Sequence, residues 1–368
     1  MKRLSTLRLA LGYAGMYFGA GFVSGQEIRQ FFGVYGAAGL FGLILSALLL
    51  FAAGAAFFEL ARRNPDRTAG ELLVPGHSPL LSGAVNLAQD VLLFGVVIIM
   101  TAGAGAMAHQ VTGFPAPAAG FLFAALVCLY SMKNVRSMVA LFSLLTPCLT
   151  VCALFTAVFV LHRYAGNASG IPGFLRRAEL FRAQEAQSAS PMLRGPFSSA
   201  VLYAVYNLFG SFSIMLAMLP LLPDGKKTAL GTALGSLFLL IPAECAAASM
   251  LAVPECAAEE VPAVYLAGLI APWFRNLYSL LMLSGMASAA LGCLVGFLEQ
   301  LKLRAASAAP VNRFPYRRLS ALTCAAAWAF SLLGFGNLIG FIYPLFGYIG
   351  IPCVAAVLLK FLYFILIT

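Results

Sequence analysis

Apolar segments of about twenty residues or more recur along this chain, and few folds accommodate them. A helix of about 20 apolar residues spans the hydrocarbon core of a bilayer, where every backbone polar group must find a partner within the protein. The chain has 368 residues, of which 61% are hydrophobic and 10% are charged, and its mean hydropathy is +0.92. These features predict an all-α integral membrane protein with a single polytopic domain over residues 1–368.

We divide the chain into ten predicted transmembrane helices. Their approximate ranges are 6–32, 36–61, 79–110, 114–132, 135–161, 196–222, 228–250, 272–300, 318–334 and 336–366. The last boundary depends on one turn signal, Gly334-Phe335-Gly336-Asn337. Basic residues precede the first run as in a signal peptide, but the run continues past any small-residue cleavage site, so we expect a retained first helix.

The Lys and Arg residues cluster in short groups between the apolar runs. With the N-terminus in the cytoplasm, 15 of the 23 lie on the inner side: Lys2, Arg3, Arg8, Arg62, Arg63, Arg67, Lys133, Arg136, Lys226, Lys227, Lys302, Arg304, Arg313, Arg317 and Arg318. Such clustering follows the positive-inside rule and explains the net charge of +10 without nucleic acid. We expect a bacterial cytoplasmic (inner) membrane protein with both termini in the cytoplasm.

A polar stretch of about 164–194 separates five predicted helices from the next five and is expected to be an outer loop. Repeat one would cover about 6–163 and repeat two about 195–366. Because the first set begins inside and the second outside, the order predicts an inverted-topology repeat.

Two predicted helices contain polar interruptions. The first is the stretch Gly19 to Glu27, and the second is the middle of span six, with Tyr206, Asn207, Gly210 and Ser211. A membrane helix leaves backbone groups unpaired only where it lines a cavity or is buried in protein, so helices 1 and 6 are expected to be discontinuous at a binding site. Close helix packing through the glycines and interhelical hydrogen bonds from Tyr and Asn are the competing explanations.

We predict that the first interruption supplies most of the substrate-binding residues. The predicted set is Gly19, Ala20, Gly21, Phe22, Val23, Ser24, Gly25, Gln26, Glu27, Tyr206, Asn207, Gly210 and Ser211.

Glu27 has two interpretations. Ser24-Gly25-Gln26-Glu27 fits a capping box in which Ser24 and Glu27 bond each other's backbone N–H groups. Alternatively, an ionisable residue within the membrane is a functional candidate, and Glu27 would bind a substrate amine or take up a proton.

Other residues could serve a coupling ion or a gate. Asp90 and Glu244 are further proton-coupling candidates, and a structural hydrogen bond is an equal alternative for Asp90. Ser284 and Ser288 lie one turn apart and could complete a cation site, although membrane serines often bond their own helix. Tyr343 and Phe346 are gate candidates or packing aromatics.

The sequence contains no arrangement typical of an enzyme. The three His residues are isolated, and no GxSxG, HExxH or Walker A motif is present. We expect no enzymatic activity and no organic cofactor. The expected partners are the lipid bilayer and a small-molecule solute, and oligomeric state is not indicated.

Gly-Ala-Gly-Phe-Val-Ser-Gly-Gln-Glu at 19–27, followed by Phe31-Phe32, resembles the uncharacterised bacterial YkvI-type membrane protein family. Tyr343-Pro344-Leu345-Phe346-Gly347-Tyr348-Ile349-Gly350 resembles the same family's ending. That family is placed in the amino acid–polyamine–organocation transporter superfamily, so the resemblance implies the LeuT-type fold of five plus five inverted helices.

The resemblance also implies positions for substrate and ion. Substrate would lie against the unwound parts of helices one and six, here Gly19 to Gly25 and Tyr206 to Ser211. A sodium site would use carbonyls near Gly19 and Phe22 and hydroxyls of helix eight, here Ser284 and Ser288. The serines are a turn apart rather than adjacent as in many sodium-coupled relatives, so proton coupling competes.

The expected function is secondary transport of a small amine-bearing or zwitterionic solute, with an amino acid as the first expectation. Transport would proceed by alternating access with sodium or proton coupling. The alternative is a ligand-sensing membrane receptor subunit of the same fold without net transport.

Overall fold

The computed structural model describes residues 4–17, 20–64, 69–74, 78–132, 135–165, 170–186, 189–308 and 315–367, and within these ranges its regular elements are all helices. Within these ranges, seven helices are long and apolar enough to cross a membrane. They belong to α4 (Ala37–Arg63), α6 (Pro79–Thr112), α8 (Val135–Val160), α10 (Pro196–Ala217), α11 (Gly225–Ala252), α13 (Pro272–Ala308) and α15 (Phe335–Ile367). The chain is a multi-pass membrane protein.

The other three predicted spans are also helical but shorter or divided. Two are the sixteen-residue helices α7 (Ala116–Ser131) and α14 (Tyr316–Ser331). The first span consists of α1 (Thr6–Gly15), α2 (Ala20–Val23) and α3 (Gln26–Phe31). A helix therefore lies at each predicted span, whereas ten crossings and two inverted repeats stay predictions.

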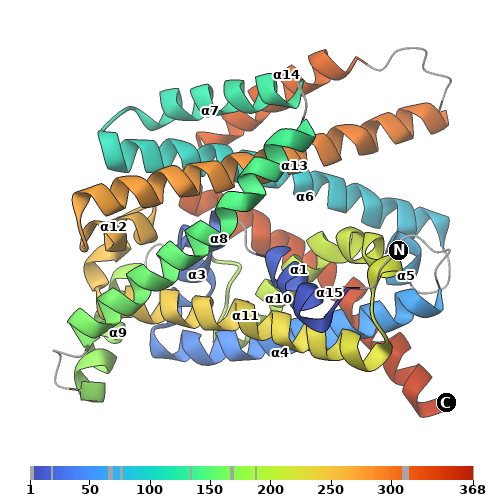
Figure 1. Ribbon diagram of the computed structural model, residues 1–368, viewed down its shortest axis with the longest axis horizontal. Helices are drawn as coiled ribbons and strands as arrows, with labels where there is room; N and C mark the ends of the chain where they lie inside the picture. The colour runs from blue at the N-terminus through green and yellow to red at the C-terminus, as the bar shows by residue number, and fades with distance from the viewer. Residues whose placement is uncertain are drawn as a thin grey trace.

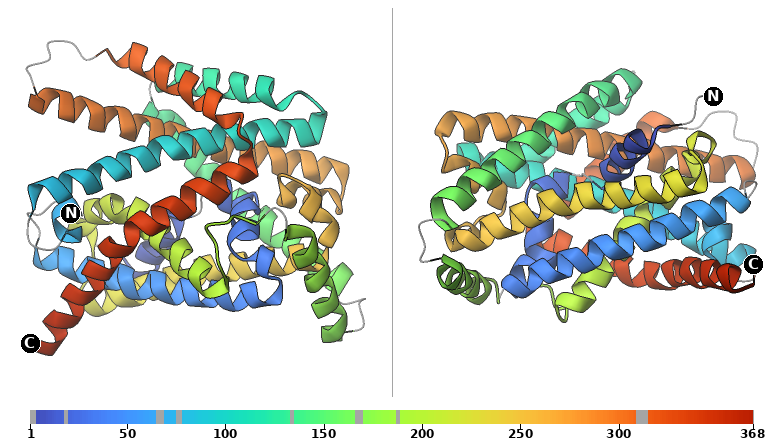
Figure 2. Two further views of the ribbon diagram at one scale, coloured as in Figure 1. Left: turned by 180° about the vertical axis from the view of Figure 1, so that it is seen from behind. Right: turned by 60° about the horizontal axis from the view of Figure 1, so that its bottom comes forward.

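Two groups of helices sandwich the divided first span. In Figure 1, α6, α7, α13 and α14 form the upper group, and α4, α10 and α11 lie below. Helix α8 crosses in front of both groups, and α15 runs away from the centre, as the two views of Figure 2 also show. This arrangement places α1 and α3 near the middle of the molecule.

Short elements close the two ends of the helix groups. The elements α9 (Gly170–Glu185), η5 (Pro254–Ala258) and α12 (Pro262–Gly268) lie at one end. Both termini and α5 (Ala69–Leu73) lie at the other. The predicted outer loop thus contains a helix, which buries Ala178, Phe181 and Glu185 against the rest of the molecule.

The predicted discontinuity of helix 6 is wrong, because α10 runs unbroken from Pro196 to Ala217. Its polar side chains donate hydrogen bonds to backbone carbonyl groups of the preceding turn, and the helix continues past them. Asn207 Nδ2 donates to the Tyr203 carbonyl at 2.9 Å, and Ser211 Oγ donates to the Leu208 carbonyl at 3.1 Å. Such back-bonding satisfies polar side chains without interrupting the helix, and a single glycine does not break it.

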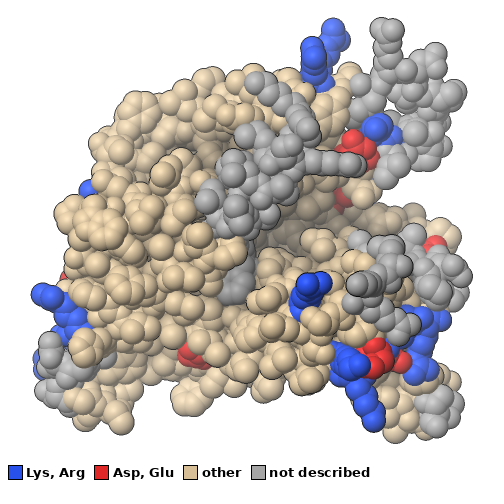
Figure 3. All heavy atoms as spheres, in the orientation of Figure 1, with Lys and Arg blue, Asp and Glu red and all other residues tan. Residues whose placement is uncertain are grey.

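The surface shows the charge distribution of a membrane protein. On the face drawn in Figure 3 the Lys and Arg side chains lie at the left edge and over the right half, and a hollow lies between the helix groups at the end that carries the termini. Large apolar side chains such as Phe41, Leu280 and Leu366 are exposed on the long helices. Lipid contact accounts for this exposure, because acyl chains solvate apolar side chains.

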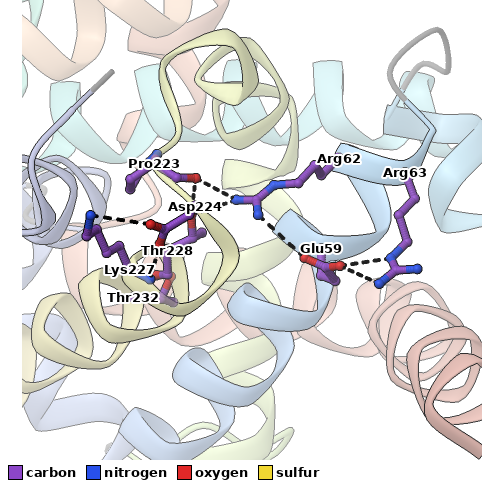
Figure 4. A network of polar contacts seen from close by, with 8 residues as sticks. All are labelled: Glu59, Arg62, Arg63, Pro223, Asp224, Lys227, Thr228 and Thr232. Atoms are coloured by element: carbon purple, nitrogen blue, oxygen red, sulfur yellow. Dashed lines mark hydrogen bonds and ion pairs between the residues drawn. The ribbon is translucent and has the colours of Figure 1, made fainter. Parts of the chain in front are cut away.

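At the terminus-bearing end, a polar network joins α4 to α11 (Figure 4). Arg62 Nη2 donates to the Pro223 carbonyl at 2.9 Å and to Thr228 Oγ1 at 2.8 Å. Glu59 pairs with both Arg62 and Arg63. Asp224 caps α11 by accepting from the Lys227 N–H at 2.9 Å. These contacts fasten two helices of the lower group to each other.

Candidate binding site

The first span is interrupted between α2 and α3 at Ser24 and Gly25. Gly25 has φ of +79°, a left-handed conformation that favours glycine, and it is the N-cap of α3. Ser24 Oγ donates to the Gly21 carbonyl at 2.7 Å and accepts from the Gln26 N–H at 3.2 Å. The predicted capping box with Glu27 is therefore wrong, because Ser24 bonds the N–H of Gln26 and α3 has no side-chain cap.

Two carbonyl groups released by the break find partners on distant elements. The Val23 carbonyl accepts from the Tyr278 hydroxyl of α13 at 2.8 Å. The Ser24 carbonyl accepts from the Ala263 N–H of α12 at 3.1 Å. Buried backbone groups are costly when unpaired, so these bonds stabilise the break against the neighbouring helices.

Glu27 is buried beside the break, with 4% of its surface exposed. A Cβ atom placed on Gly21 would lie 2.9 Å from Glu27 Oε2 and 3.5 Å from the Tyr343 hydroxyl. The Asn207 side chain of α10 lies near the same carboxyl group. Glu27 thus lies among α2, α10 and α15 and does not cap its own helix.

Aromatic rings from three helices pack on one another beside this carboxyl group. Tyr206 and Tyr343 stack with centroids 4.6 Å apart and an interplanar angle of 6°. The Tyr203 ring lies edge-on to the Tyr206 ring, with centroids 5.6 Å apart. The Phe31 ring is tilted against Tyr206, with centroids 5.5 Å apart. The Tyr203 hydroxyl is buried and has no hydrogen-bond partner within the described structure. Phe31 of α3, the two tyrosines of α10 and Tyr343 of α15 thus form one aromatic cluster next to Glu27.

The structure therefore brings together part of the predicted substrate set. Gly21, Glu27, Tyr206 and Asn207 meet at one place, together with the gate candidate Tyr343. The second gate candidate, Phe346, stacks on Phe209 with centroids 6.4 Å apart. Together the two aromatic pairs pack α15 against α10.

The remaining predicted residues lie outside this cluster. Phe22, Val23 and Gly25 line a separate cavity of about 30 Å³ with Tyr278, large enough for one or two waters. Gln26 Oε1 accepts from Arg29. Ser211 bonds Tyr17, and Gly210 faces Leu92 of α6. Gly19 and the side chain of Ala20 lie outside the described residues.

The ion-coupling candidates occupy separate positions. Ser284 is partly exposed and donates to the Leu280 carbonyl of its own helix, the structural alternative for this residue, and Ser288 is also partly exposed. Asp90 forms an ion pair with Arg304, which joins α6 to α13. Glu244 of α11 is half-buried, and its Oε1 has no hydrogen-bond partner within the described ranges.

Two glutamines of α6, Gln89 and Gln110, bond the backbone of other elements, and these contacts were not predicted from the sequence. Gln110 donates to the Val261 carbonyl at 3.2 Å and accepts from the Val261 N–H at 3.1 Å. Gln89 donates to the Phe209 carbonyl of α10 at 2.9 Å. Glutamine in an apolar helix was the only available signal, and it does not reveal the partner.

A buried ion pair at the α9 end was also missed. Arg29 Nε lies 2.8 Å from Glu185 Oε1, and Arg29 Nη1 donates to the Glu259 carbonyl at 2.6 Å. The side chains are 9% and 1% exposed. These contacts hold α3 against α9 and the segment after η5. The Arg29 guanidinium therefore has Glu185, not Glu27, as its ion partner.

With the site described, comparison with solved structures defines the fold. Mhp1, a nucleobase-cation-symport-1 family transporter with bromovinylhydantoin bound, superposes with a TM-score of 0.55 at 15% identity, over 94% of this chain and 75% of Mhp1. A manganese transporter from Eremococcus coleocola gives 0.57 at 14% identity, over 96% and 78%. The chain therefore has the fold of LeuT-type transporters.

One similar sequence covers nearly the whole protein. The uncharacterized membrane protein YkvI from Bacillus subtilis (strain 168) is 25% identical over 356 residues, covering 97% of this chain and 96% of YkvI. No protein-family model matches the chain.

Proposed function

We propose that the protein is a secondary active transporter of a small amine-bearing or zwitterionic solute, with amino acids as the first solutes to test. The observation that carries the proposal is the buried Glu27 beside a break in the first span, facing α10 and α15. A break and a carboxyl group at this depth are both costly in a membrane protein. A solute that binds there would account for both.

The fold supports transport by alternating access. Mhp1 is described as a symport-family transporter, and the Eremococcus protein as a manganese transporter. In this chain, Tyr343 and Phe346 pack α15 over the site from one side, and Arg29 holds α3 at the α9 end. Solute release toward either face would require one of these contacts to separate.

The coupling ion is a proton or sodium. Glu27, Asp90 and Glu244 are the proton candidates, and Gly19, Phe22, Ser284 and Ser288 are the sodium candidates. Asp90 already has Arg304 as its ion partner, which favours Glu27 and Glu244 among the acids. We further propose that the protein lies in a bacterial cytoplasmic membrane with both termini inside, consistent with their position at one end of the molecule.

Reconstituted proteoliposomes test this function. Uptake of radiolabelled amino acids and amines is measured under an imposed sodium gradient, a proton gradient, or neither. Accumulation that depends on one gradient and is lost in Glu27→Gln is expected. Ligand binding without flux under any gradient would instead favour the ligand-sensing receptor, and neither binding nor flux across a broad panel would overturn both.

A further inference from the structure

Glu27 differs from the other buried acids in having no cationic side chain beside it. The other two buried acids of the described chain, Asp90 and Glu185, form ion pairs with Arg304 and Arg29. No ion pair to Glu27 occurs within the described residues, and Arg29, two positions away, is held by Glu185. Burying a carboxylate without a partner is strongly unfavourable, so the site is suited to a cation from outside the chain.

The surroundings of Glu27 specify the kind of cation. The Tyr343 hydroxyl lies next to Gly21, as the Glu27 carboxyl group does, and the Tyr343 ring stacks on Tyr206, which in turn contacts Tyr203. Aromatic faces attract ammonium groups through the negative potential of the ring, and the attraction grows when both are removed from water. A carboxylate with adjacent tyrosine rings is an arrangement for an organic ammonium group.

The same surroundings offer little to a carboxylate on the solute. Arg29 is the nearest basic residue in sequence, and its guanidinium is occupied by Glu185 and the Glu259 carbonyl. The donors close to Glu27, the Asn207 amide and the Tyr343 hydroxyl, are both neutral. A second negative charge beside Glu27 would be repelled, since like charges in a low-dielectric site interact strongly.

A metal ion is a poorer match to these groups. Hard divalent cations take about six oxygen ligands, commonly from several carboxylates. No group of three or more His, Cys, Asp or Glu side chains occurs in the described ranges, and Glu27 is the single acid among the clustered tyrosines.

We propose that the site selects solutes by an ammonium group bound at Glu27 against the tyrosine rings, and that a carboxylate on the solute is not required. The favoured substrates are small primary or methylated amines rather than amino acids. This inference rests on the proposed transport function, because it assigns the substrate class of the same site.

The test compares solutes that share a carbon skeleton and differ in charge. Binding of phenylalanine, phenethylamine and 3-phenylpropanoate to the purified full-length protein is measured by isothermal titration calorimetry. Leucine, 3-methylbutylamine and 4-methylpentanoate form a second set, and tetramethylammonium and manganese chloride are added as simple cations. We expect the amines to bind at least tenfold more tightly than the matching amino acids, and the carboxylic acids not to bind.

Variants separate the two parts of the site. Glu27→Gln is expected to weaken amine binding at least tenfold, and Glu27→Asp, which keeps the charge, to restore part of it. Tyr206→Leu is expected to weaken binding about threefold to thirtyfold, as for loss of a desolvated cation–π contact, and Tyr206→Phe to retain it. Glu299→Gln, an exposed acid on α13 paired with Lys302, is the control and should bind like wild type.

Several results would overturn the inference. These are tighter binding of amino acids than of amines, binding of the carboxylic acids, manganese binding that competes at Glu27, or amine binding unchanged in Glu27→Gln with an unaltered size-exclusion profile. In each case gradient-driven flux of the solute that does bind would leave the transport proposal standing. Amine binding at Glu27 with no flux would support the inference and contradict transport.

Discussion

At the scale of single residues, Gly21 is a position where an added side chain would meet the Glu27 carboxyl group. An added Cβ would lie 2.9 Å from Glu27 Oε2, so even alanine displaces the carboxyl group. We expect Gly21→Leu to abolish ligand binding while membrane insertion and monodispersity persist. The matched control is Gly15→Ala, because Gly15 has open space around its Cβ position. Thermal-shift titration with the amine panel measures the effect, and normal binding by Gly21→Leu would place the site elsewhere.

The residue scale also shows what one sequence can reveal. Glycine spacing and Glu27 were enough to predict the break in the first span. The direction of the Glu27 side chain was not predictable, because the positive φ of Gly25 moves the cap by one residue and turns the carboxyl group toward Gly21. Tyr278, which bonds the Val23 carbonyl, lies 255 residues away in sequence, and no local pattern indicates that pairing.

At the scale of elements, polar residues in an apolar helix had two possible outcomes. In the first span they accompany a break, and in α10 they bond back to Tyr203 and Leu208 and leave the helix intact. Glycine density is the difference, since Gly19, Gly21 and Gly25 fall within seven residues and α10 has Gly210 alone in its middle. Composition indicates polarity in a span, whereas the break depends on backbone freedom.

The contact between α6 and the segment after η5 makes a prediction about accessibility. Gln110 bonds both backbone groups of Val261, and nearby Cys256 is fully buried. We expect Gln110→Leu to loosen this segment and to increase the rate at which a membrane-impermeant maleimide modifies Cys256, read by peptide mass mapping. Thr112→Val, at the same end of α6, is the control. An unchanged rate would mean that other contacts hold the segment.

The cap at the start of α11 leads to a prediction about how the protein's stability depends on pH. The Lys227 N–H donated to Asp224 holds the pKa of that exposed carboxyl group below its ordinary value of 3.8. The charged cap therefore stabilises the folded protein above pH 3.8, and this contribution disappears as pH falls through the lowered pKa. We expect Asp224→Ala to lower the melting temperature near neutral pH and Asp224→Asn, which can still cap, to lower it less.

For that prediction, thermal unfolding in detergent is followed from neutral to acidic pH. The difference between wild type and Asp224→Ala should stay constant down to the ordinary pKa and shrink below it. A difference that grows with acidification would assign the effect to another group.

At the scale of the whole molecule, both termini and α5 lie at one end and α9 with α12 at the other. The basic clusters predict that the terminus-bearing end is cytoplasmic. We expect alkaline phosphatase fused after Ala186 to be active and the same enzyme fused after Ala308 to be inactive. A green fluorescent protein fusion at the C-terminus should fluoresce, and the reverse pattern would contradict the assigned orientation.

Hydropathy predicted the positions of the helices well, because transmembrane length and composition are local properties. Assembly of the two helix groups is not local. The ion pairs Arg29–Glu185 and Asp90–Arg304 join residues more than 150 positions apart, and only the three-dimensional structure reveals them. The number of membrane crossings and the repeat symmetry are properties of this assembly, and they stay predictions.

The bonds that satisfy the break in the first span have a consequence for biosynthesis. Val23 and Ser24 depend on Tyr278 and Ala263, which a ribosome synthesises more than 230 residues later. During that interval the pieces α1, α2 and α3 are each too short to cross a bilayer, and their carbonyls lack these partners. The segment that emerges first is consequently among the last to reach its final place in the membrane.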